Sequence, residues 1–280
     1  MPDSDATATA TFLQLHHDSG PLLLPNAWDT GSARLLASLG FRALATTSSG
    51  YAASLGRLDG SLSRDEALEH TAQLVRATAL PVNADLENCF ADEPAGAAET
   101  IRLALGTGTA GASIEDFSGR PDSPIYDLGL ATDRVQAAAE AAHAGPQRLV
   151  LTARAENHLH DRADLADTIT RLQAYQEAGA DVLYAPGLTS ADDIRAVVTS
   201  VDRPVNVLAM SATPTVAELA EIGVARISVG GAFAFAALGA LLESARELLD
   251  QGTYGYTTRS AAGRAAIESG FSDESGAGTA

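Results

Sequence analysis

Short apolar segments alternate with longer helical segments eight times along this chain, and this alternation restricts the folds available to it. The apolar segments have the length and composition of buried parallel strands. Eight strand–helix units are what a (β/α)8 TIM-type barrel requires. The sequence predicts strands at residues 22–28, 43–47, 81–87, 111–115, 149–153, 182–185, 205–208 and 226–229, and helices at 30–39, 63–78, 95–105, 133–144, 164–178, 190–199, 216–222 and 234–249.

A doubly wound open sheet would use similar strands. The count of eight and the absence of a Gly-x-Gly-x-x-Gly turn after the first strand favour the barrel. We therefore predict one α/β barrel domain over residues 1–250. Residues 251–280 are rich in Gly, Ser, Thr and Ala, which predicts a C-terminal extension with a helical fragment at best and then a frayed, partly disordered tail.

Charge and composition exclude several classes of function. The formal net charge of −18 argues against nucleic acid and anionic membrane surfaces as partners. A start without signal-like character and the lack of any run of about 18 apolar residues predict a cytoplasmic protein without a membrane span. All 18 basic residues are arginine, so Schiff-base aldolases, pyridoxal-phosphate enzymes and Walker-type phosphate loops, which need lysine, are excluded.

Two carboxylates, Asp85 and Glu87, end the third predicted strand with a spacing of i, i+2. Successive strand residues point to opposite faces, so these two would point the same way. Like charges held close together call for water, a shared proton or a bound cation. A divalent ion with oxygen ligands is the simplest interpretation, and solvated acids at a strand end are the alternative.

The active site of a barrel lies at the carboxyl ends of its strands, so the residues at those ends are the candidates for a functional site. Acids there could hold Mg²⁺ directly and through water, and Arg154 could grip a substrate carboxylate. Backbone N–H groups at Ser49 and Gly50 could bind another substrate oxygen. Tyr184 and Asn206 could orient substrate or donate a proton, or simply pack. The other candidates at these ends are Trp28, Asp29, Tyr51, Asp59, Asp85, Glu87, Glu115 and the Gly230–Gly231 pair.

Several motifs together resemble the isocitrate lyase/phosphoenolpyruvate mutase superfamily. They lie at residues 24–29, 47–50, 55–60, 85–87, 114–116 and 153–154, and the similarity extends over roughly residues 20–250. The resemblance implies an Mg²⁺- or Mn²⁺-dependent barrel, commonly a tetramer whose last helix is exchanged between paired subunits. It also implies cleavage or formation of C–C or C–P bonds next to a carboxylate, through an enolate.

The resemblance also implies roles for individual residues. Asp85 would bind the metal directly, and its bound waters would be held by Asp59, Glu87 and Glu115. Ser49 and Gly50 would bind the oxo-acid end of the substrate and Arg154 its carboxylate. Trp28 and Asp29 would line the same pocket.

One segment departs from the family pattern. Lyases of this superfamily carry a Lys-Lys-Cys-Gly-His loop after the fourth strand, whereas residues 116–121 read Asp-Phe-Ser-Gly-Arg-Pro. This argues against cysteine-dependent cleavage of isocitrate or methylisocitrate. We predict a Mg²⁺-dependent C–C lyase, hydrolase or decarboxylase that acts on a small 2-oxo or 2-hydroxy carboxylate. The alternatives are a C–P enzyme of the phosphoenolpyruvate mutase or phosphonopyruvate hydrolase type, and a non-enzymatic carboxylate-binding barrel.

Overall fold

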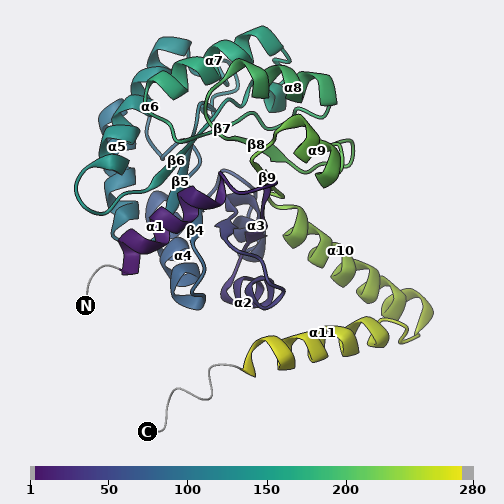
Figure 1. Ribbon diagram of the computed structural model, residues 1–280. Coiled ribbons are helices and arrows are strands. Elements are labelled where there is room, and N and C mark those ends of the chain that lie inside the picture. The colour runs from purple at the N-terminus through teal and green to yellow at the C-terminus, as the bar shows by residue number, and fades with distance from the viewer. Residues whose placement is uncertain (1–3, 273–280) are drawn as a thin grey trace, which may run out of the picture.

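A parallel sheet curves into a barrel in the computed structural model, which describes residues 4–272 (Figure 1). The strands follow the spatial order β1-β9-β8-β7-β6-β5-β4-β3-β2, and every neighbouring pair is parallel. The predicted α/β barrel is therefore confirmed. The strands are β1 (Leu22–Leu24), β2 (Asn26–Ala27), β3 (Leu44–Thr46), β4 (Val82–Asp85), β5 (Gly111–Glu115), β6 (Val150–Arg154), β7 (Val182–Tyr184), β8 (Val205–Leu208) and β9 (Arg226–Ser228).

The barrel closes through a strand that is broken in two. The predicted strand 22–28 is interrupted at Pro25, whose nitrogen carries no hydrogen to donate to a neighbouring strand. On one side of the break β1 pairs with β9, and on the other side β2 pairs with β3. The nine segments therefore occupy eight strand positions around a closed ring.

Helices cover the outside of the barrel between successive strands. The predicted cap Ser63 is confirmed, because its side chain accepts from Glu66 N–H while Glu66 accepts from Ser63. The helix predicted at 133–144 begins at Leu128 in the structure, because Asp127 caps it there. The outer helices are α2 (Thr30–Ser38), α4 (Arg64–Ala77), α5 (Pro94–Leu105), α6 (Leu128–His143), α7 (Leu165–Glu177), α8 (Ala191–Ser200) and α9 (Val216–Ile222), with a short 3-10 turn at Asn157–His160.

Two helices were not predicted from the sequence. Helix α1 (Ser4–Leu15) buries Phe12 and Leu15 against Leu22, Leu24 and neighbouring strand residues, and so closes the amino end of the barrel. Helix α3 (Ser48–Ser54) follows β3 directly and is capped by Thr47. The carboxyl end of the barrel is therefore the open one. No helix within residues 4–272 is long and apolar enough to cross a membrane.

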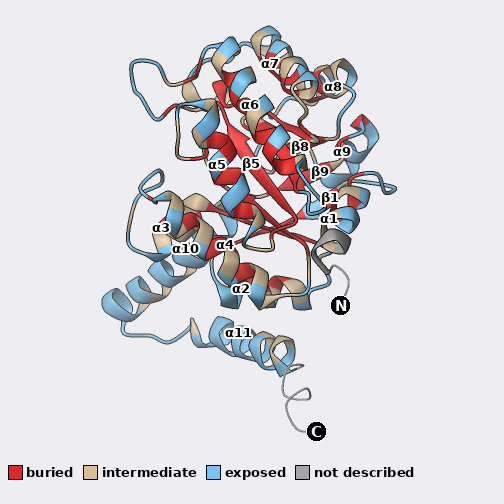
Figure 2. Cartoon of the chain, turned by 90° about the vertical axis from the view of Figure 1, so that its left-hand side faces the viewer, coloured by how far each residue is buried: buried red, intermediate tan, exposed pale blue. Residues whose placement is uncertain are grey.

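The C-terminal segment is more ordered than predicted. Helix α10 (Ala232–Arg246) continues into a π-helical turn (Glu247–Gln251) and leaves the barrel, and α11 (Thr257–Gly270) folds back beneath α2 (Figures 1 and 2). The Glu247 carboxylate joins the two helices by accepting from Thr253 Oγ1 at 2.7 Å and Tyr256 N at 3.1 Å. The predicted helical fragment is thus a helix of 14 residues, and the Glu247 contacts hold the turn that leads into it. The predicted tail beyond residue 272 lies outside the described residues.

Candidate active site at the carboxyl ends of the strands

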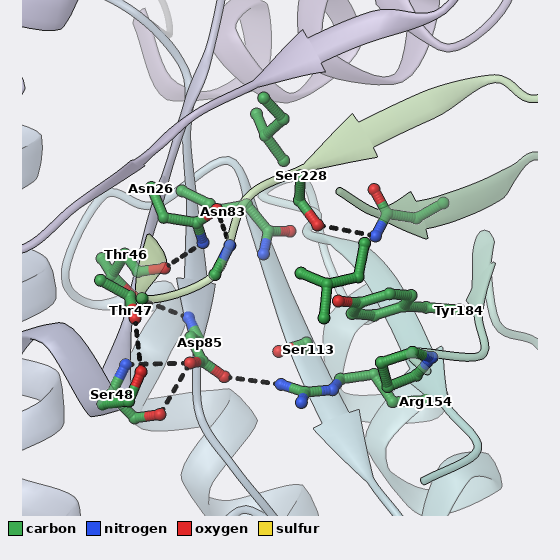
Figure 3. Close-up of a pocket in the computed structure, with 18 of the residues that line it drawn as sticks. Asn26, Thr46, Thr47, Ser48, Asn83, Asp85, Ser113, Arg154, Tyr184 and Ser228 are labelled. Carbon is green, nitrogen blue, oxygen red and sulfur yellow. Dashed lines mark hydrogen bonds and ion pairs between the residues drawn. The ribbon is translucent and has the colours of Figure 1, made fainter. Parts of the chain in front are cut away.

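Arg154, the last residue of β6, binds three carboxylates at the open end of the barrel, and Figure 3 shows its contact with one of them, Asp85. Its Nη1 lies 2.9 Å from Asp85 Oδ1, its Nη2 3.1 Å from Glu115 Oε2, and its Nε 2.7 Å from Glu156 Oε1. Burial lowers the pKa of this guanidinium, but the charges of the three acids outweigh that effect and raise it well above its usual value. Arg154 is therefore permanently charged and fixed in position.

Asp85, at the end of β4, is held by a second set of contacts. Its Oδ2 accepts hydrogen bonds from the backbone N–H and the hydroxyl of Ser48, both at 2.9 Å. Its own backbone N–H donates to Thr46 Oγ1 at 2.8 Å. The carboxylate thus joins β4, β6 and the start of α3, and Figure 3 shows it between Ser48 and Arg154.

Burial raises the pKa values of several acids at this end, and repulsion among these acids adds to the effect. Burial, followed by the charges of Asp85 and Asp59, raises the pKa of Glu87 to about 7. Burial raises the pKa of Glu115 well above its usual value, although Arg154 opposes the shift. Loss of hydration and the charge of Asp85 raise the pKa of Asp59. A bound cation would relieve this repulsion.

Glu87 lies in the acid cluster, but not because of the strand geometry that the sequence predicted. Strand β4 ends at Asp85, and Glu87 has a left-handed backbone with φ of 49°, so the strand argument for its direction does not hold. The backbone N–H of Glu115 donates to Glu87 O at 3.0 Å. Buried Arg134 holds the following turn by donating to three backbone carbonyls, at Asn88, Ala91 and Glu115. Such strained non-glycine conformations persist where packing enforces them, often at functional sites.

The residues present fit a Mg²⁺ ion bound mainly through water. Glu87 Oε1 is buried and lacks a hydrogen-bond partner within the described chain. Among residues 4–272, no three His, Cys, Asp or Glu side chains lie where together they could hold a metal ion. Mg²⁺ commonly takes one or two carboxylates and keeps several waters. The assignment of Asp85 as direct ligand, with Asp59, Glu87 and Glu115 holding waters, stays a prediction.

Two adjoining cavities open at this end of the barrel. The outer cavity, about 490 Å³, is lined by residues that include Asp59, Glu87, Glu115, Glu156 and His160. The inner cavity, about 200 Å³, extends into the barrel. It is smaller than the pockets of roughly 300–1,000 Å³ that take drug-sized ligands, so it suits a small molecule. Both cavities are lined by Ser48, Asp59, Arg154 and Leu159, and the inner one also by Asn26, Thr46, Ser49, Asn83, Asp85, Ser113, Tyr184, Asn206, Arg226, Ser228 and Gly231.

Four predicted substrate-binding residues lie outside the linings of these two cavities. Asp29 caps α2 by accepting from Ser32 N at 2.7 Å. Trp28 contributes its backbone carbonyl to His70 Nε2, and Tyr51 stacks on the ring of His70 with centroids 3.8 Å apart. Gly50 donates its N–H to Thr47 Oγ1 at 3.3 Å, and a side chain there would collide with Thr47 and Trp28. These contacts give all four positions a structural role, which could not be read from their place after a strand.

Tyr184 and Asn206 both line the inner cavity, and their contact with substrate stays a prediction. Burial raises the pKa of Tyr184 to about 12, so its hydroxyl keeps its proton at neutral pH. Asn206 donates to Ser228 Oγ at 2.9 Å. At the next strand end, the N–H of Gly230 donates to Asn26 Oδ1 at 2.9 Å, which leaves it unavailable to a phosphate. This contact gives Gly230 a structural role.

Arg226 is the charged residue of the inner cavity lining that the sequence analysis missed. Barrel interiors are usually filled by branched apolar side chains, yet buried polar groups alternate with apolar ones along these strands. The pairs Asn83/Asp85, Ser113/Glu115, Thr152/Arg154 and Arg226/Ser228 each keep the i, i+2 spacing. That period-two pattern inside otherwise apolar strands was the available signal, because alternate residues share one face.

The fold and the site together define an α/β barrel with a small, charged cavity at the carboxyl ends of its strands, the arrangement of barrel enzymes. A family model described as phosphoenolpyruvate phosphomutase matches residues 12–249. The chain therefore belongs to the isocitrate lyase/phosphoenolpyruvate mutase superfamily. Homologues include lyases, hydrolases and mutases that act on small carboxylates, and the superfamily commonly uses Mg²⁺.

Three similar proteins illustrate the relationship. An uncharacterized protein of Mycobacterium tuberculosis is 34% identical over 241 residues, which cover 86% of this chain and 89% of that protein. A crystal structure from Burkholderia cenocepacia J2315, assigned only broadly as a lyase/mutase, is 53% identical, with a TM-score of 0.89 over 91% of this chain and 92% of that chain. The crystal structure of 2,3-dimethylmalate lyase is 26% identical, with a TM-score of 0.80 over 91% and 90% of the two chains.

Proposed function

We propose that this chain is a Mg²⁺-dependent lyase or hydrolase that cleaves a C–C bond in a small 2-oxo or 2-hydroxy carboxylate. The observation that carries the proposal is the cluster of acids around Arg154 at the mouth of a small polar cavity. Similarity to 2,3-dimethylmalate lyase supports C–C chemistry, and the match to the phosphoenolpyruvate phosphomutase model keeps C–P chemistry as the alternative. The use of Gly230 N–H by Asn26 weighs against a phosphonate substrate.

Several residues of the site can bind different parts of the substrate. Three of the five guanidinium N–H groups of Arg154 contact acids, so one on each Nη is available to a substrate carboxylate. The hydroxyl of Tyr184, which keeps its proton, is a donor toward a substrate oxygen. Asn206 and Ser49 supply further polar contacts along the cavity wall. When bound, Mg²⁺ would supply electrostatic stabilisation of negative charge on substrate oxygens.

Oxalate, a planar mimic of pyruvate enolate, provides a test that does not require the substrate. We expect calorimetric titration of oxalate into metal-stripped protein to show binding only after Mg²⁺ is added. Acetate, which has a single carboxylate and cannot chelate, serves as the control ligand and should bind at least about 10-fold more weakly, because it loses a charge-assisted contact. Failure of oxalate to bind under both conditions would contradict the proposed metal site.

We also propose that the chain forms a tetramer in which α10 and α11 pack on a neighbouring subunit. Helix α10 extends from the barrel, and α11 folds back beneath α2 (Figure 1). Helix α10 and the turn that follows it expose Phe235, Leu241, Leu242 and Leu249 by 50–84%. Apolar area of this kind on one helix typically marks an interface. A second copy of the chain would bury it and would complete the exchange that the family resemblance implies.

Truncation before Phe233 is expected to abolish this assembly. Size-exclusion chromatography with light scattering should show the full chain as a tetramer and the truncated chain as a smaller species. Leu241→Glu should have the same effect, because it places a charge on the exposed helix face. Leu58→Glu, at a leucine of the barrel loops that is 84% exposed, is the matched control. A truncated chain that stays tetrameric would rule out helix exchange.

A further inference from the structure

Arg134, a buried residue of α6, donates hydrogen bonds to the backbone of two segments that adjoin the acid cluster. Its Nη1 lies 3.0 Å from Glu115 O, at the end of β5. Its Nη2 lies 3.1 Å from Ala91 O and also donates to Asn88 O, in the turn that follows β4. The guanidinium therefore joins the end of β5 to the turn that carries Glu87.

The backbone of this turn has an unfavourable conformation. Glu87, Cys89 and Phe90 have φ values of 49°, 58° and 55°, in the left-handed region that residues other than glycine rarely adopt. Such a conformation persists only where the surrounding structure enforces it. Thr100 Oγ1 donates to Cys89 O at 2.7 Å, and Arg134 supplies the two further contacts to the turn described above. The turn is thus held by side chains from two outer helices, α5 and α6.

Arg134 is itself fixed on its other side by an aromatic ring. The guanidinium carbon lies 4.2 Å from the centroid of the buried Tyr126 ring, and the Tyr126 hydroxyl donates to Asp92. Among residues 4–272, no carboxylate lies within ion-pair distance of Arg134. A buried charge costs free energy, and an apolar side chain of similar volume would avoid this cost. The contribution of Arg134 is therefore the conformation that it imposes rather than its packing.

The conformation of the turn determines where the Glu87 carboxylate lies. The backbone N–H of Glu115 donates to Glu87 O at 3.0 Å, while the carbonyl of Glu115 accepts from Arg134. Glu87 lines the outer cavity, and its buried Oε1 lacks a hydrogen-bond partner within the described chain. Since no hydrogen bond fixes this oxygen, its position depends on the backbone of the turn.

We propose that Arg134 is a positioning residue that sets the Mg²⁺ affinity of the site by holding the turn that carries Glu87. This inference rests on the proposed function, in which Glu87 holds water bound to the metal, and it assigns control of that contact to a residue outside the site. Arg134 lines neither cavity, so it acts on the ion only through the position of the carboxylate. Groups that orient the ligands of a metal commonly change its affinity 10- to 100-fold.

Calorimetric titration of Mg²⁺ into the metal-stripped full chain tests the assignment. Arg134→Met keeps most of the side-chain volume but removes the donors, and we expect it to weaken Mg²⁺ binding by about 10- to 100-fold. Arg134→Lys should weaken it by about 3- to 10-fold, because one ammonium group cannot reach all three carbonyls and at least one hydrogen bond is lost. Leu74→Ala, at a buried leucine of a separate apolar cluster, is the control for a general loss of stability and should leave Mg²⁺ affinity unchanged.

A double-mutant cycle with Glu87→Gln separates positioning from a purely structural role. Glu87→Gln alone should weaken Mg²⁺ binding by about 10- to 100-fold. Adding Arg134→Met to it should change the affinity by less than about 3-fold more, because both substitutions act through one carboxylate. Equal losses that add in the double variant would show that Arg134 does not act through Glu87 and would overturn the inference.

The remaining outcomes distinguish this inference from the proposed function. Mg²⁺ binding that is lost in Glu87→Gln but kept in Arg134→Met, with unchanged circular dichroism, would keep the metal site and reject the role of Arg134. If Arg134→Met does not fold, an unchanged affinity in Arg134→Lys would reject that role as well. Absence of Mg²⁺ binding by the unmodified protein would overturn both the metal site and the inference.

Discussion

Asp85→Asn is expected to abolish Mg²⁺-dependent binding of oxalate and to reduce turnover of the substrate by about 10³-fold or more. The asparagine keeps the shape of the side chain but removes the negative charge, and it presents an N–H₂ group to either Ser48 or Arg154, which are both donors. Loss of even an outer-sphere metal partner commonly costs 10- to 100-fold in affinity. Loss of a fixed electrostatic group at the reacting centre costs about 10²–10³ in rate.

Calorimetry for Mg²⁺ and oxalate, together with kcat/KM for the substrate once it is found, measures this effect. Asp65→Asn is the matched control, since Asp65 lies 86% exposed in the first turn of α4. The control should behave as the unmodified protein. Retention of both metal binding and activity by Asp85→Asn would contradict the assignment of the site.

Arg154→Met is expected to destabilise the folded chain by about 3–5 kcal/mol at pH 7, the usual cost of removing one partner from buried ion pairs. The substitution leaves Glu115 and Glu156, which are 8% and 2% exposed, without their cation. Their pKa values, already raised by burial, would rise further above the unfolded value of 4.5. The folded variant would then bind more protons than its unfolded chain.

The pH dependence of this deficit follows from that difference in bound protons. A group whose pKa is raised in the folded state stabilises the fold below its unfolded pKa. This stabilisation is lost as the pH rises from the unfolded pKa through the folded pKa. Urea unfolding of Arg154→Met should therefore show a smaller deficit at pH 5 than at pH 8. Arg102→Met, which removes a half-exposed pair with Glu99, is the control and should cost at most about 1 kcal/mol at either pH. An equal deficit at both pH values would show that the acids do not depend on Arg154.

The barrel could be predicted from sequence because its strands and helices repeat a simple local pattern. Parallel strands buried on both faces are apolar runs, and caps such as Ser63 with Glu66 mark where helices begin. Asp85, Glu115 and Arg154 were identified because barrel topology brings strand ends together regardless of side-chain detail. Their convergence is a property of the fold rather than of local sequence.

Other parts of the site depend on contacts between residues far apart in the chain. Asp29, Gly50 and Tyr51 follow strands as site residues do, but Ser32, Thr47 and His70 give them structural partners. Arg226 precedes the end of its strand. The prediction considered only residues at the strand ends, so it did not include Arg226, which lies deeper in the barrel. Helix α1 was missed because its low amphipathic character gives little periodic signal, and only Phe12 and Leu15 anchor it strongly.

The broken strand at Pro25 has a consequence for how the protein is made. Leu22–Leu24 pair with Arg226–Ser228, so the ring cannot close until more than 200 residues have been synthesised. Closing a loop of that length has an entropic cost that must be met before the contacts form, which slows folding. A nascent chain that has not yet emerged from the ribosome as far as β9 has a gap where the barrel should close. The binding cavity, which includes Arg226, therefore arises in the last stage of folding.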